Sequence, residues 1–445
     1  MKIIYQNLSN WSNSKAIYTK VYYPQNEKEI KEIFKEFKNE NKSFSIMGNG
    51  NTYGDSFLNS EGFTINTSLL DKIYKINLDK NFVDVSCGIK INKLINTLLS
   101  KKRIINNLPG SHNVTIGGCI ASNVHGKDSF KFGIFGNNLI SLRVLRSDGK
   151  ILTLSKNSKD FISYVGGYGI NGIILSAKIK IRKISSNNLM VSTHKFKNLK
   201  QLIDLFKHNE KASYYMGAWI DHFSSSPKGI FKCARWNGKD HNIKKIEEEY
   251  NLFSKFIIFF VYPVLRKFFV RRFFIKFLNK IFFYFSKKKN TFTSFKNFYY
   301  PQEKYMPKHS YLYDQGKINI QILIPKKYFL KHFDVISKLC KKYKFESWWL
   351  GIKKHRKTAF RHSFSSDGYD ITLQWSKKYI TNLRFKIFYS KLINYMSKNN
   401  IILYHSKDIL LRKKDFIKFR QSKIFYRKIF NNSKVLNNLI LKRLG

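Results

Sequence analysis

The first hydrophobic pattern along the chain is that of an amphipathic helix over residues 27–39, followed by a short strand over residues 43–47. The apolar residues of the helix recur at spacings of three and four, so they share one face. They are Ile30, Ile33, Phe34 and Phe37. The strand then runs into glycine, and the two segments together predict a β-α-β opening of the fold.

Short alternating or wholly apolar runs dominate residues 62–181, with Gly, Asn and Asp turns between them. Such runs are typical of strands, so this half is predicted to be mostly β-structure. Past about Ser185, the pattern changes to a mixture of helical and strand periods. Helices are expected over residues 199–206 and 328–343, and strands over residues 214–220 and 318–324.

A segment dense in aromatic and basic residues lies inside this second unit, over residues 256–285. Its longest uncharged run is about ten residues, whereas a bilayer-spanning helix needs roughly 20. After Pro263, basic residues recur at helical spacing opposite apolar ones, which predicts a helix lying in a membrane interface. The alternative is a buried helix whose long basic side chains reach solvent. The basic residues are Lys267, Arg271, Arg272, Lys276 and Lys280, and the apolar ones are Leu265, Phe269, Phe273 and Phe277.

The chain is strongly basic, with 82 Lys and Arg against 28 Asp and Glu in 445 residues and a formal charge of +54. This excess favours anionic partners, namely nucleic acid, acidic lipid or a phosphorylated substrate, although part of it is also expected from a general richness in lysine. The four cysteines are far apart and form no CxxC spacing, which argues against a zinc site or a disulfide framework. Because residues 1–18 contain no sustained apolar stretch, we expect a cytoplasmic protein.

Three glycine clusters carry the most informative chemistry: GNGNTYG at residues 48–54, LPGSHNVTIGGCIASNVHGK at residues 108–127 and VGGYGINGII at residues 165–174. Glycine accepts positive φ angles and has no side chain to block a phosphate, so such turns can aim backbone N–H groups at one anion. The small residues of the second cluster allow a flat ligand to approach closely, and its hydroxyls can bond phosphate oxygens. Three clusters ahead of a separate unit predict a bound dinucleotide.

In their order, these clusters resemble the FAD-binding domain of the vanillyl-alcohol-oxidase family, and most of all its branch of decaprenylphosphoryl-ribose 2'-oxidases. The match covers most of residues 46–181 and returns at FYYP (298–301), GKINIQILIP (316–325) and YHSKD (404–408). It implies an α+β fold with a PCMH-type two-subdomain FAD-binding domain over residues 1–185. A substrate (cap) domain with an antiparallel sheet would follow over 186–400, carrying the basic aromatic insertion at 255–290. Residues 401–445 would then return to the FAD domain.

The resemblance implies a set of cofactor contacts within the glycine clusters. They are Gly48, Asn49, Gly50, Asn51, Thr52, Tyr53, Gly110, Ser111, Thr115, Gly117, Gly118, Ser122, His125, Gly126, Gly169, Gly172 and Ile173. In the sugar-lactone oxidases of the same superfamily, a histidine of the first glycine loop is bonded covalently to the flavin. The corresponding place here is Asn51, whose amide cannot form that bond, so we expect FAD to be held non-covalently.

The implied reaction is hydride transfer from a carbinol carbon to flavin N5, with Lys407, His125, Lys127 and Tyr53 as catalytic residues. Lys407 is the first choice for contacting the reacting hydroxyl, either as a proton acceptor or as an electrostatic stabiliser. The substrate would be contacted by Tyr299, Gln321, Lys353 and Thr372. Thr372 stands where the resembled oxidases carry a cysteine near the flavin, so thiol-directed inactivation is not expected there. No metal site is expected.

These expectations combine into an FAD oxidoreductase that oxidises a secondary alcohol of a polyprenyl-phosphate-linked pentose or related glycolipid. It would act in cell-wall or polysaccharide biosynthesis, peripherally at the inner face of the cell membrane, and a partner reductase could complete an epimerisation. One alternative is a soluble aldonolactone oxidase of the same fold. Another is a basic protein that binds nucleic acid or membrane through a non-catalytic flavin fold. The glycine clusters would then have no purpose, so no nucleic acid partner is expected.

Overall fold

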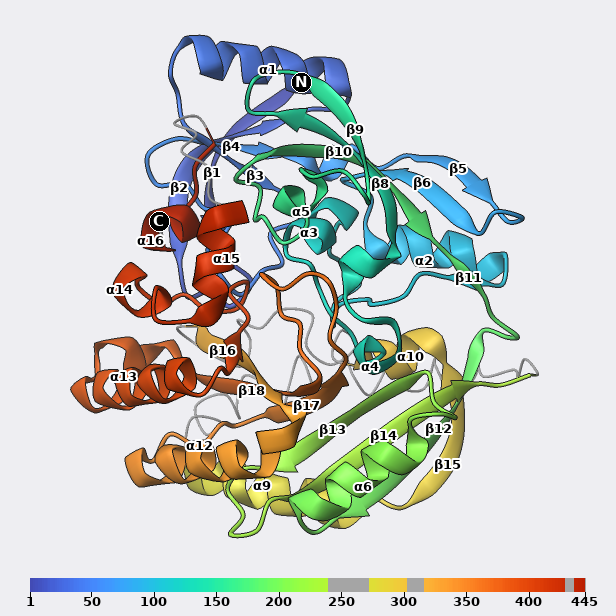
Figure 1. The fold of residues 1–445 in the computed structure, drawn as a ribbon, viewed down its shortest axis with the longest axis vertical. Helices are drawn as coiled ribbons and strands as arrows, with labels where there is room; N and C mark the ends of the chain where they lie inside the picture. Colours follow the sequence, from blue (N-terminus) through green and yellow to red (C-terminus); the bar gives the residue numbers. More distant parts are fainter. Residues whose placement is uncertain (239–271, 302–315, 429–435, 445) are drawn as a thin grey trace.

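The computed structural model describes residues 1–238, 272–301, 316–428 and 436–444. Two sheets and their helices form the upper half of the view in Figure 1, and a single large sheet forms the lower half. The C-terminal helices lie beside the upper half, next to the first sheet. The predicted α+β class with antiparallel sheets is confirmed.

The chain opens with a four-stranded mixed sheet in the order β1-β2-β4-β3. The amphipathic helix α1 (Glu27–Asn39) buries the four apolar residues predicted to share a face, and the side chain of Asn26 caps its first turn by accepting from the Glu29 N–H. This confirms the helix read from the sequence. The strands are β1 (Lys2–Ser9), β2 (Ala16–Tyr23), β3 (Phe44–Met47) and β4 (Phe63–Asn66).

A five-stranded antiparallel sheet follows, in the order β5-β6-β10-β8-β9. Its strands are β5 (Ile73–Asn77), β6 (Phe82–Ser86), β8 (Leu139–Arg146), β9 (Ile151–Ser155) and β10 (Gly172–Lys180). The helices of this part are α2 (Ile91–Ser100), α3 (Ile116–Ala121), α4 (Ser129–Phe132) and α5 (Phe161–Tyr164). The short strands β7 (Arg103–Ile104) and β11 (Arg182–Lys183) pair with each other. Both sheets share one apolar core, so they fold as a unit.

The second half is built on an eight-stranded antiparallel sheet in the order β15-β12-β14-β13-β17-β18-β16-β19. Its strands are β12 (Asn188–Phe196), β13 (Tyr215–Asp221), β14 (Lys228–Trp236), β15 (Lys289–Ser294), β16 (Lys317–Pro325), β17 (Leu350–His355), β18 (Gly368–Ser376) and β19 (Ile402–Leu403). Strands β16, β17 and β18 lie side by side near its centre, and together they bring distant parts of the sequence to one place. The strands expected over 214–220 and 318–324 are confirmed as β13 and β16.

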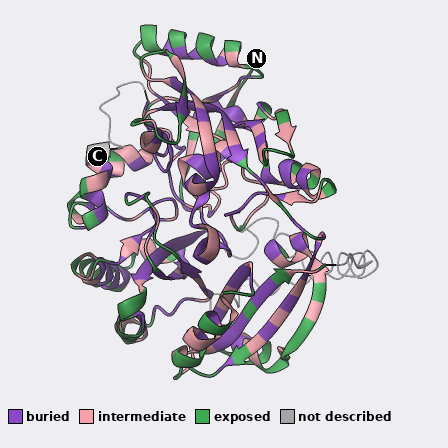
Figure 2. Cartoon of the chain, turned by 45° about the vertical axis from the view of Figure 1, so that its right-hand side comes forward, coloured by how far each residue is buried: buried purple, intermediate pink, exposed green. Residues whose placement is uncertain are grey.

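Three helices, α6 (Leu199–Asn209), α12 (Phe329–Tyr343) and α13 (Leu383–Lys398), bury one side each in a common core with this sheet. Their other sides face solvent, as the green outer surfaces in Figure 2 show. The first two of these helices agree with the sequence prediction to within three residues. The short helix α10 (Phe295–Tyr299) follows β15 and packs into the core of the first half.

The described part of the basic aromatic segment is helix α9 (Arg272–Phe285), while residues 256–271 lie outside the described residues. Ile275 and Asn279 are its buried residues, whereas Phe273 is 83% and Phe277 51% exposed. Lys276 is exposed as well, and at 3.6 residues per turn it lies only about 60° from Phe273. The expectation that basic and aromatic side chains occupy opposite faces is therefore wrong for this part: both face solvent, and the small buried face opposes them.

The C-terminal segment crosses from the large sheet to the first half. It carries α14 (Lys413–Phe416), α15 (Arg420–Lys428) and α16 (Leu439–Leu444). The backbone of Leu436 bridges Phe44 of β3, and the Leu439 N–H donates to the carbonyl of Leu58. The last helix is thereby attached to the sheet that begins the chain. Within the described parts of the chain, no helix is both long and apolar enough to span a bilayer.

Candidate active site

A cavity of about 340 Å³ opens between the two halves of the molecule. This volume falls within the roughly 300–1,000 Å³ of typical ligand pockets. All three glycine clusters line it from the first half, and strands β16, β17 and β18 line it from the second through Asn319, Lys353 and Thr372. The turn after β19 adds Lys407. Segments that are hundreds of residues apart in the sequence thus meet in one site.

The first glycine loop is shaped for close contact with a ligand. Gly50 has a φ of +67°, which a side-chain-bearing residue rarely adopts, and a Cβ added to Gly48 would lie 2.1 Å from the Thr115 hydroxyl oxygen. Asn49 donates through its amide to Oδ1 of Asn51 at 2.8 Å. Nδ2 of Asn51 is buried and has no hydrogen-bond partner within the described structure. A buried donor of this kind needs an acceptor, which a bound phosphate or sugar oxygen of FAD supplies.

Most residues expected to contact the cofactor line the cavity. They are Gly48, Asn49, Gly50, Asn51, Thr52, Tyr53, Gly110, Ser111, Thr115, Gly117, Gly118, Ser122, His125, Gly169 and Gly172. Gly126 and Ile173 do not line it: a Cβ at Gly126 would meet the Tyr299 hydroxyl at 2.2 Å, and Ile173 is fully buried. A Cβ at Gly117 would come 3.1 Å from that of Cys87, so a larger residue there would disturb the wall. The buried donor of Asn51 and the small residues of this wall therefore fit FAD.

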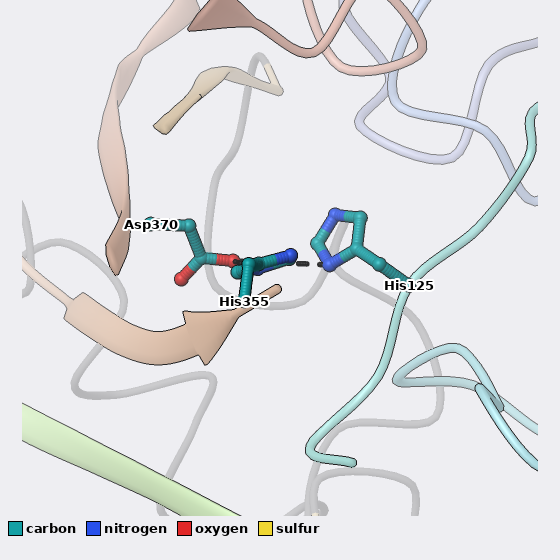
Figure 3. Close-up of side chains that lie close together, drawn as sticks. All are labelled: His125, His355 and Asp370. Carbon is teal, nitrogen blue, oxygen red and sulfur yellow. Dashed lines mark hydrogen bonds and ion pairs between the residues drawn. The ribbon is translucent and has the colours of Figure 1, made fainter. Parts of the chain in front are cut away.

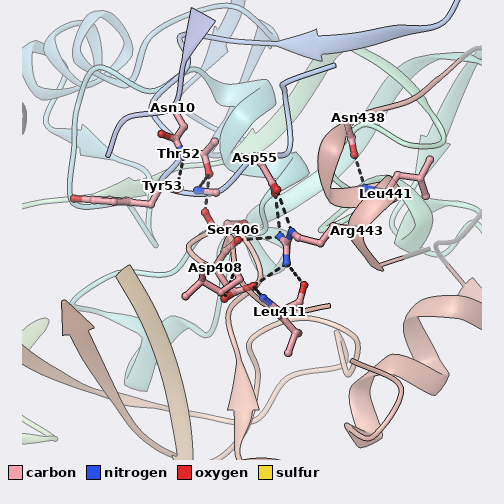
Figure 4. A network of polar contacts seen from close by, with 12 residues as sticks. Asn10, Thr52, Tyr53, Asp55, Ser406, Asp408, Leu411, Asn438, Leu441 and Arg443 are labelled. Carbon is pink, nitrogen blue, oxygen red and sulfur yellow. Dashed lines mark hydrogen bonds and ion pairs between the residues drawn. The ribbon is translucent and has the colours of Figure 1, made fainter. Parts of the chain in front are cut away.

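Lys407 reaches the cavity from a turn that is fixed to the first glycine loop. The carbonyl of Ser406 accepts hydrogen bonds from the Gly54 N–H at 2.8 Å and from the Thr52 hydroxyl at 2.7 Å. Beside these contacts, Arg443 of α16 forms a bidentate pair with Asp55 and a further pair with Asp408 (Figure 4). The loop and the turn therefore move as one piece.

Burial and neighbouring charges change the acidity of Lys407. Burial and the neighbouring Lys353 lower the pKa of Lys407 to about 7, although Asp370 opposes this shift. Its Nζ lies 5.5 Å from the centre of the Tyr53 ring. Burial raises the pKa of the Tyr53 phenol, so this group stays protonated. Among the residues predicted to be catalytic, Lys407 thus has the properties of a proton acceptor near neutral pH.

Lys127 and Tyr299, by contrast, lie behind the cavity wall and hold it together. The Tyr299 hydroxyl donates to the carbonyl of Leu108 at 2.6 Å, and Nζ of Lys127 donates to the carbonyl of Tyr299 at 2.6 Å. Burial and Lys353 lower the pKa of Lys127 to about 7. Neither side chain lines the cavity, and neither does Gln321. The structure therefore separates these three from the predicted catalytic and substrate residues that do line it, namely Tyr53, His125, Lys353, Thr372 and Lys407.

A compact polar cluster stands behind His125 (Figure 3). Asp370 of β18 is fully buried and accepts hydrogen bonds on Oδ2 from Gln321 at 2.5 Å and from His355 at 2.9 Å. Nζ of Lys353 lies 3.2 Å from the same oxygen and 3.1 Å from Nδ1 of His125. Burial opposes the charge of Asp370, but Lys353 and His355 outweigh it and lower the pKa of Asp370 to about 2.

His125, His355 and Asp370 also have the spacing of a metal site, because one ligand atom of each lies within 4.8 Å of the others. The ammonium of Lys353, however, contacts both His125 and Asp370. A positive charge in that place occupies the ligands and repels a cation. These side chains are therefore held by hydrogen bonds and an ion pair with Lys353, and they do not form a metal site.

Sequence reasoning missed Asp370, His355 and Arg443. Asp370 is two residues from Thr372 in the same strand, and side chains at this spacing point to the same face of a sheet. The sequence could therefore have predicted that Asp370 faces the same side as Thr372, but not which residues it contacts. His355 follows the predicted Lys353 by two residues and shares its side of β17. Arg443, near the end of the chain, carries no local signal.

Comparison with known proteins agrees with this geometry. Residues 19–155 match the model of the FAD binding domain. The chain is 32% identical to the decaprenylphosphoryl-beta-D-ribose oxidase of Mycolicibacterium smegmatis over 185 residues, which cover 41% of this chain and 40% of that protein. It is 25% identical to the L-gulonolactone oxidase of Mus musculus over 217 residues, or 48% of each chain. The D-arabinono-1,4-lactone oxidase of Candida glabrata is 23% identical over 263 residues, 58% of this chain and 48% of that one.

These matches confirm the predicted resemblance and FAD as the cofactor. The chain spans less than half the length of the relatives it matches. The reaction and the substrate must therefore be argued from the site itself.

Proposed function

We propose that this protein is an FAD-dependent oxidoreductase that oxidises a secondary alcohol of a sugar, and that its substrate is a polyprenyl-phosphate-linked pentose or a close relative. The observation that carries the proposal is the joining of the glycine loop to the Lys407 turn around one cavity. A cofactor cradle and a lysine with a pKa of about 7 then face the same space. This is the combination that alcohol oxidation needs.

When bound, FAD supplies the hydride acceptor for such a reaction. The residues of the chain orient the alcohol and take its proton. Neutral Lys407 accepts the hydroxyl proton as the carbinol carbon is oxidised to a ketone, and Lys353 places a positive charge beside the developing negative charge on oxygen. Oδ1 of Asn319 lines the cavity without a partner in the described structure, so it can accept a second hydroxyl of the sugar.

The exposed face of α9 supports a substrate carried by lipid. It presents Phe273 and Phe277 together with Lys276 and Lys280 to solvent. Aromatic side chains that enter the interface and cations that attract anionic headgroups are the two features of peripheral membrane helices. We therefore place the enzyme at the inner face of the cell membrane, where a polyprenyl-phosphoryl sugar is found, and where a partner reductase could act on the ketone.

A second candidate is an aldonolactone oxidase, which the match to L-gulonolactone oxidase favours. A lactone oxidase needs no lipid anchor, and the exposed aromatic face of α9 would then be without a role. The two candidates differ in what reduces the flavin: a polyprenyl-phosphoryl pentose in one case and a free aldonolactone in the other.

The test begins with the visible spectrum of the purified protein and continues with stopped-flow bleaching of the flavin band by each substrate. Lys407→Met should retain FAD and slow bleaching by roughly 10²- to 10⁴-fold, the usual worth of a positioned proton-transfer group. Lys407→Arg keeps the charge but cannot lose a proton, so it separates the two roles proposed for Lys407. Lys414→Met, an exposed lysine of α14, is the matched control. A Lys407→Met rate within about threefold of wild type removes Lys407 from the mechanism, and a protein that cannot bind FAD refutes the proposal.

A further inference from the structure

The cluster behind His125 contains a chain of hydrogen bonds whose direction can be worked out from the chemistry of its members. Asp370 is a buried carboxylate with a pKa of about 2, so it only accepts. Lys353 is an ammonium that only donates, and Nζ of Lys353 lies 3.2 Å from Oδ2 of Asp370 and 3.1 Å from Nδ1 of His125. The contact with His125 must then be a hydrogen bond from Lys353 to an unprotonated Nδ1.

This direction fixes the tautomer of His125. Burial and Lys353 hold the pKa of His125 well below its usual range, so the ring is neutral and has one proton. With Nδ1 accepting, that proton is on Nε2. His125 lines the cavity, and its ring packs against those of Phe364 and Tyr404, whose centres are each 4.9 Å away. The residue therefore offers a fixed N–H donor at the cavity wall.

We propose that Asp370 is a positioning residue that acts through Lys353: it anchors the Lys353 ammonium against Nδ1 of His125 and so keeps His125 as the Nε2–H tautomer, a hydrogen-bond donor for the substrate oxygen. The anchor is built on the sheet, because the Lys353 N–H also donates to Oδ1 of Asp370 at 2.8 Å across paired strands. Both carboxylate oxygens are thus engaged, and the side chain cannot rotate freely.

Gln321 and His355, the other two side chains that contact Asp370, do not require this residue to carry a negative charge. A neutral amide at this position could be accommodated by Gln321, whose own amide can turn over, and by His355, which can exchange its tautomer. Lys353 has no such alternative, because its backbone N–H and its ammonium each donate to a different oxygen of Asp370, whereas Asp370→Asn offers only one. With that oxygen kept by the backbone N–H of the paired strand, the ammonium faces an N–H₂ group for which it has no acceptor. Replacing Asp370 by Asn should therefore release Lys353 selectively and leave the strands paired.

The first test measures the tautomer directly. In FAD-loaded protein labelled with ¹⁵N at histidine, we expect wild-type His125 to show an unprotonated Nδ1 and a protonated Nε2, with the signal assigned by its loss in His125→Gln. Asp370→Asn and Lys353→Met should each abolish this fixed pattern. Asp367→Asn, which changes an exposed carboxylate three residues away, is the control and should preserve it. A protonated Nδ1 in the wild type, or an unchanged signal in Asp370→Asn, overturns the inference.

The second test uses kinetics and rests on the proposed function. Asp370→Asn should slow flavin reduction on the order of 10- to 100-fold. Lys353→Met should slow it at least as much, because it also removes the positive charge beside the substrate oxygen, and the double variant should be no slower than Lys353→Met, because residues of one network are not additive. Losses that multiply in the double variant would show independent roles and overturn the positioning role. If no sugar reduces the flavin, the proposed function fails, whereas the tautomer measurement still decides this inference. If Asp370→Asn does not fold, the Lys353→Met spectrum decides it alone.

Discussion

Arg443 links the first glycine loop to the turn that carries Lys407, and its loss should destabilise both. Its guanidinium donates to both carboxylate oxygens of Asp55 at 3.0 Å and to Asp408 at 2.8 Å, and also to the carbonyl of Leu411 at 2.6 Å. The arginine side chain is 12% exposed, and Asp55 and Asp408 are 1% and 0% exposed. Arg443→Met therefore leaves two buried carboxylates without their counter-charge, which typically costs about 3–5 kcal/mol.

The loss can be measured as a fall in Tm. With an unfolding entropy of roughly 2.1 cal/mol/K per residue, 3–5 kcal/mol corresponds to about 3–5 °C for a chain of this length. Because Asp55 follows the glycine loop and Asp408 follows Lys407, FAD affinity and the rate of flavin reduction should fall as well. Calorimetry on the FAD-free and FAD-loaded protein measures the first effect, and flavin fluorescence titration measures the second.

Lys442→Met provides the matched control for Arg443→Met, since it changes the neighbouring cation of the same helix. Lys442 pairs with Glu61 at the surface, where the glutamate is 73% exposed, and such pairs contribute at most about 1 kcal/mol. If Arg443→Met melts within 1 °C of Lys442→Met and binds FAD as tightly, the argument that this network joins the two segments is refuted.

Three further predictions concern the cofactor, the membrane and pH. Because Asn51 cannot bond covalently to flavin, acid precipitation should release the FAD, and fluorescence retained by the denatured chain would contradict this. Replacing Phe273 and Phe277 by Ser should weaken binding to anionic liposomes at moderate salt without loss of FAD, whereas Phe292→Ser, on the exposed side of β15, should change neither. Finally, flavin reduction should accelerate as pH rises through about 7, because the proposed proton acceptor is neutral Lys407, and a pH-independent rate would exclude that role.

The sequence predicted those parts of the site that are marked by a pattern of neighbouring residues along the chain. The glycine loop is recognisable because its backbone conformation requires glycine at positions such as Gly50, and helix α1 because its apolar period is regular. The cluster around Asp370 has no such signal: His125 and Lys353 are 228 residues apart, and only the pairing of β17 with β18 brings Lys353 to Asp370. For α9, the amino-acid pattern does not indicate which face packs against the sheet, and the prediction of opposite basic and aromatic faces was wrong for that reason.

The excess of positive charge at the cavity explains how one arrangement can serve both proton removal and charge stabilisation. Lys127 and Lys407 have pKa values lowered to about 7, and burial together with Lys407 holds the pKa of Lys317 well below its usual range. These three lysines are thereby disposed to be neutral, whereas Lys353 forms an ion pair with Asp370. A neutral lysine can take the proton of an alcohol, and the Lys353 ammonium then favours the negative charge that develops on the oxygen. The one buried carboxylate of the cluster thus decides which lysine orients His125 and which is left to accept the proton.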